Sequence, residues 1–284
     1  MGKYLIINAD DFGLTNGVTR GIIEAAKAGI VTCTSVLINE LIYEKISFNK
    51  DDCSDFGIGL HLNLTQGRSI LPAVDVSSLV SFDGYFMKPN QLFANPEKIH
   101  PAQVEKEWRA QIAAFRTIFG IPDHLDSHHH VHLYPSLFNI FCQLAVELQL
   151  PVRFPIQVNN IPEVRILPFS IAEGKELLDS HWNEEQNLLD LIKLRYPDHF
   201  MDNFFYIYKD QPEIIQWIIA TFPEGSSELM CHPGYMDARL VKISTYTQRR
   251  EEELAVLIAG STREILKRAG IDLIRFSDLK TYNS

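Results

Sequence analysis

Short apolar runs alternate with longer stretches of helical periodicity along most of this chain. Segments 4–8 (YLIIN), 33–39 (CTSVLIN) and 56–64 (FGIGLHLNL) are short and apolar, and polar or glycine-containing residues bound them. Such runs are typical of buried strands. The same interpretation applies to the later segments HLDSHH (124–129), PVRFP (151–155), ELMCH (228–232) and IDLIRF (271–276).

Apolar residues at helical spacing fill the intervals between these runs. A helix is expected over 101–119, after Pro101 and before Gly120, and another begins at Pro135. Further helices are expected before Gly29, over 212–222 and over 247–269. Strands that alternate with helices predict a parallel sheet with right-handed crossovers. We therefore expect an α/β fold, an irregular (β/α) barrel of about seven parallel strands in a single domain (1–284), with a doubly wound open sheet as the alternative.

Two segments interrupt the alternation, at about 66–100 and 156–211. Both are longer than ordinary connections, and such segments are usually lids, binding loops or oligomer contacts. We expect their aromatic residues to pack mainly in the core, with ligand stacking or a dimer contact as the alternative. These aromatics are Phe82, Tyr85, Phe86, Phe204, Phe205, Tyr206 and Tyr208.

Composition narrows the range of partners. The 284 residues are 46% hydrophobic, which is enough for a sizeable core, and the formal net charge is −10. An acidic chain offers no basic surface to phosphates, so neither nucleic acid nor an anionic membrane is an expected partner. Without a signal-like start or a bilayer-length apolar run, we expect a cytoplasmic protein with reduced cysteines and a possible homodimer.

Carboxylates and imidazoles lie at the ends of several predicted strands. Asp10 and Asp11 follow the first strand, His61 lies near the end of the third, and His232 follows ELMC. The segment HLDSHHHVH (124–132) holds five of the ten histidines. If that segment is extended, alternate histidines point to opposite faces, so only one or two can be ligands.

Each of these features alone has a plainer explanation, as a helix cap or a core histidine. Together they are significant, because enzymes built on (β/α) barrels assemble their sites at the carboxyl ends of the strands. One carboxylate with two imidazoles leaves coordination positions open, which is typical of a catalytic metal site, whereas a structural zinc site favours cysteines. Zinc, cobalt or nickel suits these donors, and magnesium can bind with waters.

Four segments, NADDFGLT, GLHLNLT, HLDSHHHVH and MCHPGY, resemble the signatures of the YdjC-like carbohydrate deacetylases, in the expected order between residues 8 and 235. The resemblance implies an irregular barrel and a hydrolase that removes acetyl groups from N-acetylated sugars, such as the N-acetylglucosamine units of chitooligosaccharides. It further implies one divalent metal, most often magnesium. The implied ligands are Asp11, His61 and His128, and the implied catalytic residues are Asp10 as general base, His232 as acid and Arg153 to orient a carboxylate.

Several alternatives stay open at this point. Sequence does not distinguish the base from the ligand within the adjacent pair Asp10 and Asp11. A metal-dependent sugar isomerase or phosphoesterase would use similar residues, although such sites often hold two metals and more carboxylates. A non-catalytic sugar-binding or metal-binding protein would also retain such a pocket.

Overall fold

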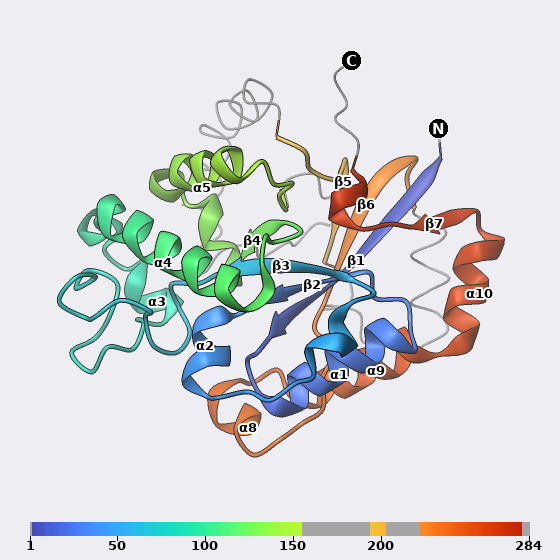
Figure 1. Cartoon of the computed structure of the whole chain (residues 1–284), viewed down its shortest axis with the longest axis horizontal. Coiled ribbons are helices and arrows are strands. Elements are labelled where there is room, and N and C mark those ends of the chain that lie inside the picture. Colours follow the sequence, from blue (N-terminus) through green and yellow to red (C-terminus); the bar gives the residue numbers. More distant parts are fainter. Residues whose placement is uncertain (1, 155–193, 203–221, 280–284) are drawn as a thin grey trace.

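The computed structural model describes residues 2–154, 194–202 and 222–279. Within these described residues, seven parallel strands form one sheet, which curves into a half-barrel (Figure 1). This confirms the predicted α/β fold with a parallel sheet. The strand order is β4-β3-β2-β1-β6-β5, with β7 also paired to β1. The strands are β1 (Lys3–Phe12), β2 (Cys33–Val36), β3 (Gly57–Leu62), β4 (Leu125–Ser127), β5 (His199–Met201), β6 (Gly225–Cys231) and β7 (Ile271–Leu273).

The first strand, β1, is the centre of the sheet because three strands pair with it. One edge of β1 pairs with β6 from Lys3 to Ala9. The other edge pairs with β7 near Lys3 and with β2 from Asn8 onward. The carboxyl end of β1 therefore lies between β2 and β6, where the ends of parallel strands bring their following residues together.

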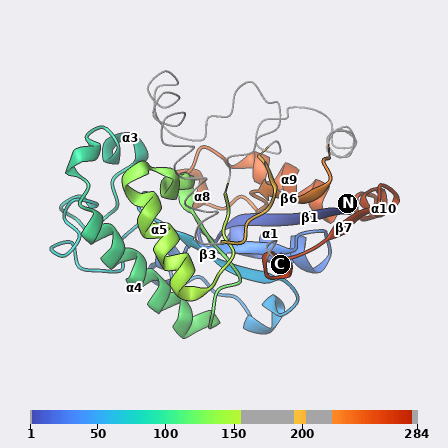
Figure 2. The same ribbon diagram turned by 90° about the horizontal axis from the view of Figure 1, so that it is seen from above.

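Helices surround the sheet, with α1 and α9 packed together on one side and α4 against α5 on another (Figures 1 and 2). Two predicted helix starts, at Pro101 and Pro135, are confirmed. The predicted helix 247–269 is interrupted at Ala259, which has extended backbone angles, and is therefore two helices. The helices are α1 (Asn16–Lys27), α2 (Ile38–Tyr43), α3 (Pro89–Leu92), α4 (Pro101–Phe119), α5 (Pro135–Leu148), α8 (Leu240–Ile243), α9 (Gln248–Ile258) and α10 (Gly260–Arg268).

The core lies between the sheet and these helices. Trp108 and Phe115 on α4 are fully buried, as their helical spacing predicts. Near the end of β1, Phe12 meets Phe48 edge to face at 5.3 Å, and Phe48 stacks on Phe119 at 5.5 Å. Through Phe48, these contacts pack the end of α4 against β1, the strand that carries Asp10 and Asp11. All four cysteines are buried.

The segment at about 66–100 has its own local structure. Two isolated antiparallel bridges, Arg68 with Tyr85 and Val80 with Phe86, fold it back on itself. Phe86 is buried, in agreement with the predicted core packing, whereas Phe82 is fully exposed. The Tyr85 ring is covered by the Arg68 guanidinium, which lies 4.4 Å from the ring centre. The segment at 156–211 falls mostly outside the described residues, as do Phe204, Phe205, Tyr206, Tyr208 and nearly all of the predicted helix 212–222.

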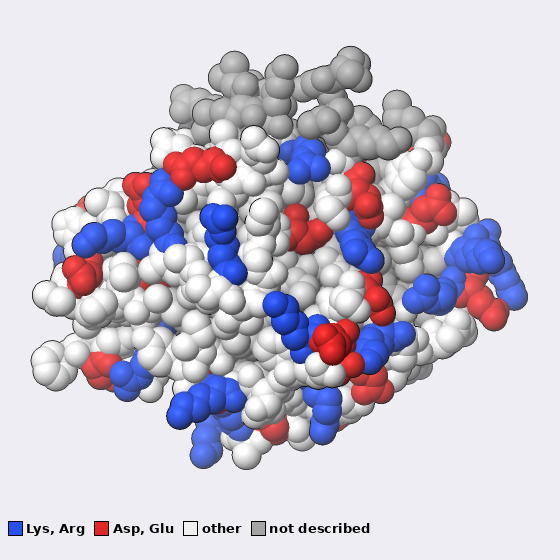
Figure 3. All heavy atoms as spheres, in the orientation of Figure 1, with Lys and Arg blue, Asp and Glu red and all other residues white. Residues whose placement is uncertain are grey.

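The visible surface carries both signs of charge. Figure 3 shows lysine and arginine side chains interspersed with aspartate and glutamate over this face. Among the described helices, none is long and apolar enough to cross a bilayer.

Candidate active site

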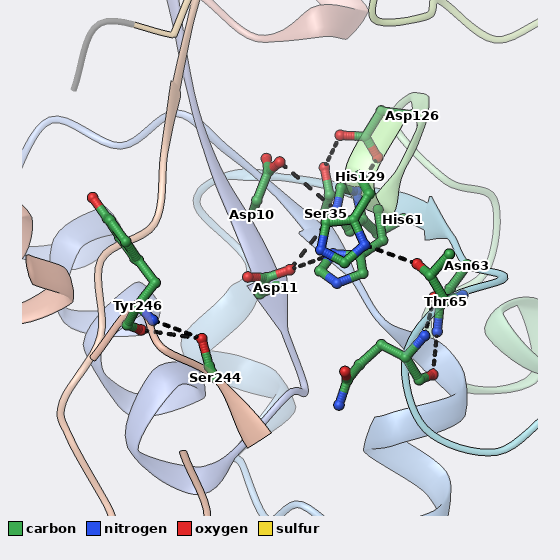
Figure 4. A network of polar contacts seen from close by, with 12 residues as sticks. Asp10, Asp11, Ser35, His61, Asn63, Thr65, Asp126, His129, Ser244 and Tyr246 are labelled. Atoms are coloured by element: carbon green, nitrogen blue, oxygen red, sulfur yellow. Dashed lines mark hydrogen bonds and ion pairs between the residues drawn. The ribbon is translucent and has the colours of Figure 1, made fainter. Parts of the chain in front are cut away.

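Asp10 and Asp11 lie side by side at the end of β1 because the strand is irregular there. In a regular strand, successive side chains point to opposite faces. The pairing of β1 with β2 shifts register between Ala9 and Phe12, and Asp11 has a φ of 74°. An irregularity of this kind re-aims a side chain, which allows both carboxylates to lie within 4 Å of the same His61 nitrogen. Figure 4 shows both facing His61.

Asp10 is held by a buried arginine. Arg153 donates hydrogen bonds from its two terminal nitrogens to the two oxygens of Asp10, each at 2.7 Å. Asn8 donates a further hydrogen bond to Oδ1 of Asp10 at 2.7 Å. Such a bidentate, charge-assisted pair fixes the plane of the carboxylate as well as its position. Asp10 is therefore an oriented carboxylate with little rotational freedom.

Arg153 is in turn surrounded by further carboxylates. Its Nε donates to Glu228 at 2.7 Å, and its Nη1 lies 3.0 Å from Asp126. With Asp10, three carboxyl groups surround the Arg153 guanidinium, and its single positive charge cannot balance three negative charges. Burial raises the pKa of Glu228 to about 7, despite the opposing effect of Arg153. Glu228 therefore holds its proton more readily than an exposed glutamate.

His61 receives a carboxylate partner from the neighbouring strand. His61 on β3 pairs in register with Asp126 on β4, and its Nδ1 lies 2.8 Å from Asp126 Oδ1. Burial opposes charge on His61, but Asp126 and Asp10 raise its pKa overall. A carboxylate that accepts from Nδ1 leaves Nε2 as the atom free to bind a metal. That Nε2 lies 3.7 Å from Asp10 and 3.8 Å from Asp11.

Asp11, His61 and His128 converge on one point. Nδ1 of His128 lies 3.0 Å from Oδ1 of Asp11, and the His61 and His128 ring centres are 5.4 Å apart. The three candidate ligand atoms lie within 4.8 Å of one another. Burial would raise the pKa of Asp11, but His128 and Arg250 hold it well below 3.8, so Asp11 is an ionised carboxylate.

The histidine run is not the extended strand that the sequence suggested. Strand β4 ends at Ser127, and residues 128–133 form an irregular turn in which His129 and His130 have left-handed backbone angles. The alternation expected for an extended segment is therefore wrong. His129 contacts Thr65 at 2.9 Å and His132 contacts Ser127 at 2.5 Å, so both histidines have partners away from Asp11.

His232 follows β6 and lies partly buried near the two aspartates. Burial lowers the pKa of His232 to about 4, although Asp10 and Asp11 oppose that shift. Its backbone N–H donates to Glu253, which also accepts from the Tyr246 hydroxyl. Burial raises the pKa of Glu253 to about 7.

Helix α9 contributes two site residues that sequence reasoning missed. Arg250 donates a hydrogen bond from Nη2 to Oδ2 of Asp11 at 2.6 Å, and Glu253 lies one turn further along. Both side chains are buried. The sequence gives only a weak signal for these two residues, because QRREEEL (248–254) resembles the exposed, charged start of a surface helix. Figure 4 shows Tyr246, which precedes α9, on the opposite side of the aspartates from His61.

These residues fit a divalent cation. Within the described chain, Oδ1 of Asp11 receives no hydrogen bond of good geometry, although it is buried and faces two imidazoles. One carboxylate oxygen with two imidazole nitrogens is a donor set for zinc, cobalt or nickel, and waters can complete the shell of a harder ion. Asp10, fixed by Arg153, stays beside this donor set as a separate carboxylate. The arrangement can therefore bind a metal and accept a proton at adjacent points.

Known proteins resemble this chain over nearly its whole length. Residues 4–268 match the family model described as YdjC-like protein. The chain is 32% identical to a carbohydrate deacetylase of Geobacillus stearothermophilus, over 98% of each chain. It is 30% identical to a chitooligosaccharide deacetylase of Proteus mirabilis, over 98% of this chain and 100% of that protein. The crystal structure of a candidate cellobiose-phosphate cleavage protein from Enterococcus faecalis V583 superposes with a TM-score of 0.77 at 33% identity, covering 98% of this chain and 99% of that one.

Proposed function

The chain belongs to the family of YdjC-like proteins, and from that premise we propose that it is a metal-dependent carbohydrate deacetylase. The proposed substrates are N-acetylated sugars, such as the N-acetylglucosamine units of chitooligosaccharides. Relatives named as carbohydrate deacetylases, at about one-third identity over nearly the whole chain, support the reaction class. The proposed products are acetate and a free amino sugar.

One observation carries the mechanism. Nε2 of His61 lies within 4 Å of both adjacent carboxylates, yet their other partners differ: Arg153 holds both oxygens of Asp10, whereas Asp11 faces His128 at 3.0 Å. This division supports Asp11, His61 and His128 as metal ligands and Asp10 as general base. A bound divalent ion would supply Lewis acidity, which can lower the pKa of a water from about 16 to about 7.

Asp10 would take the proton of the attacking water. Arg153 keeps both oxygens of Asp10 in a fixed plane, so the carboxylate is oriented before the substrate binds. General base catalysis of this kind typically contributes about 10²- to 10⁴-fold in rate. Because Arg153 itself is buried and held by Glu228, its own position is also fixed.

His232 is the proposed acid for the departing amine. Its pKa of about 4 means that the imidazole is neutral at pH 7 in the free protein. His232 must therefore gain its proton during turnover, and the proton removed from the attacking water is the nearest source. Glu253 anchors the His232 backbone and so keeps the ring beside the aspartates.

The test is acetate release by metal-depleted protein to which one divalent ion at a time is restored. N,N′-diacetylchitobiose is the first substrate, and other N-acetylated sugars follow. We expect metal-dependent release that is lost in His128→Ala and kept in His100→Ala, a matched change at an exposed histidine. Folded, metal-loaded protein that releases no acetate from any of these sugars would overturn the proposal. Comparison of magnesium with zinc, cobalt and nickel identifies the preferred ion.

A further inference from the structure

A second group of donor side chains lies at the opposite ends of the strands from the candidate active site. Cys33 is the first residue of β2, and Asp123 and His124 immediately precede β4. Oδ2 of Asp123 lies 3.6 Å from Sγ of Cys33 and 3.3 Å from Nδ1 of His124. The three donor atoms lie within 4.8 Å of one another. Cys33 and His124 are fully buried, and 11% of the Asp123 side chain is exposed.

Hydrogen bonding at Ser35 determines which nitrogen of His124 carries a proton. The Ser35 hydroxyl donates to Asp126 at 2.7 Å and accepts from Asn8 at 2.8 Å. Its one proton is therefore committed, and Nε2 of His124, 3.1 Å away, must be a donor to it. In the neutral ring, Nδ1 then points its lone pair at a carboxylate oxygen of Asp123. Two acceptors that face each other at this distance require a proton or a cation between them.

Strand β3 leaves room for this group by having glycine at two positions on one face. A Cβ at Gly57 would lie 2.6 Å from Oδ2 of Asp123 and 2.8 Å from Sγ of Cys33. A Cβ at Gly59 would lie 2.3 Å from the His124 ring. The donors therefore reach across β3, which separates β2 from β4 in the sheet. Phe276 closes one side by stacking on His124 at 4.0 Å.

We propose that Cys33, Asp123 and His124 form a second cation site, which takes zinc or a similar borderline divalent ion. Metal–ligand bonds of about 2.0–2.3 Å in a tetrahedral site place ligand atoms roughly 3.3–3.7 Å apart. The two distances from Asp123 already match that spacing. Because 11% of the Asp123 side chain is exposed, a water would supply the fourth ligand from that side.

On binding, the Cys33 thiol releases its proton to solvent and binds as thiolate, while Nδ1 of His124 binds through its lone pair. Because this step releases a proton, binding strengthens as pH rises. The ion stabilises the fold by joining the start of β2 to the residue before β4 across β3.

This second site is connected to the candidate active site by hydrogen bonds. Nε2 of His124 contacts Ser35, Ser35 donates to Asp126, and Asp126 contacts Nδ1 of His61. An ion on Nδ1 of His124 makes its Nε2–H a stronger donor to Ser35. The second site therefore helps to fix Asp126, the partner of His61.

Cobalt titration tests the proposal, because none of the candidate catalytic ligands is a cysteine. We expect folded, cobalt-saturated protein to bind two equivalents and to show a thiolate-to-cobalt charge-transfer band. The band should persist in His128→Ala with one equivalent remaining. It should vanish in Cys33→Ser and persist in Cys231→Ser and Cys53→Ser, which change two other buried thiols.

Two results would overturn the proposal. One is the absence of a thiolate band in wild-type protein saturated with cobalt, which would leave a proton as the occupant between Asp123 and His124. The other is a band that survives in Cys33→Ser. Because Cys33→Ser changes a fully buried position, Asp123→Asn at the partly exposed ligand is the second variant. It should weaken cobalt binding at this site by at least about tenfold while thermal unfolding confirms a folded protein.

Discussion

Arg250 and Asp11 are 239 positions apart in the sequence and 2.6 Å apart in the fold, where Nη2 of Arg250 donates to Oδ2 of Asp11. The hydrogen bond occupies one carboxylate oxygen and leaves the other, Oδ1, facing His61 and His128. Asp11 is therefore oriented to offer one oxygen to a metal. Partners that orient a ligand in this way contribute to metal affinity although they do not touch the ion.

Arg250→Gln should lower metal affinity or turnover by about 10- to 100-fold, because the Asp11 carboxylate becomes free to rotate. Calorimetric metal titration and acetate release measure the two effects separately. Arg249→Gln is the matched control, since Arg249 is the preceding residue on α9 and is only half-buried. Equal behaviour of the two variants would mean that Arg250 does not orient Asp11.

Asp10 and Asp11 should respond differently to the same substitution. Asp10→Asn removes the proposed base and should lower turnover by about 10²- to 10⁴-fold while metal still binds. Asp11→Asn should lower metal affinity itself, because it removes the charge of the proposed ligand that faces two imidazoles. Metal titration of both variants is the measurement. If Asp10→Asn loses the metal and Asp11→Asn keeps it, the two roles are reversed.

Asp126 should matter to metal binding without being one of the proposed ligands. Its Oδ1 fixes the tautomer and direction of His61 through the 2.8 Å contact with Nδ1. Asp126→Asn removes that charge and should weaken metal affinity by about 10- to 100-fold. Asp75→Asn, at a partly exposed aspartate bonded to Lys106, is the control. Unchanged metal affinity in Asp126→Asn would show that His61 needs no carboxylate partner.

The parallel α/β architecture was predictable because it follows from the spacing of apolar residues. Strand and helix periods are local properties, and the starts of α4 and α5 also carry a local signal, Pro101 and Pro135. Boundaries that depend on tertiary packing were less accurate. The predicted strand 33–39 ends at Val36, where α2 soon begins, although LIN is as apolar as the strand before it.

The partners of the site residues were harder to predict than the residues themselves. Asp10, His61 and His232 stand out because polar side chains at the ends of apolar strands are unusual. Arg250 and Glu253 carry no such signal, since charged residues near the start of an amphipathic helix are ordinary. The packing of α9 against α1 brings them next to Asp11, near the end of β1, and His232, just after β6. The left-handed angles of His129 and His130 likewise follow from tertiary contacts rather than from their identity.

Glu253 should make the stability of the metal-free protein depend on pH. Burial raises its pKa in the folded state from 4.5 to about 7. Below pH 4.5 the Glu253 carboxyl is protonated in both the folded and the unfolded protein, so its burial does not make the free energy of unfolding depend on pH. Between pH 4.5 and 7 the unfolded chain ionises first, so folding stability falls as pH rises, by on the order of 3 kcal/mol for this group.

Glu253→Gln cannot ionise, so its free energy of unfolding should fall less than that of wild type between pH 4.5 and pH 8. The Gln oxygen can still accept from the His232 N–H, and the Tyr246 hydroxyl can turn to accept from the amide. Urea unfolding of wild type, Glu253→Gln and the exposed control Glu252→Gln at both pH values gives the comparison. Burial also raises the pKa of Glu228 to about 7. Glu228 is present in all three proteins, so its contribution to the pH dependence is the same in each. Parallel pH dependence in wild type and Glu253→Gln would show that Glu253 stays ionised in the folded protein, with Arg250 and its hydrogen-bond donors compensating for its burial.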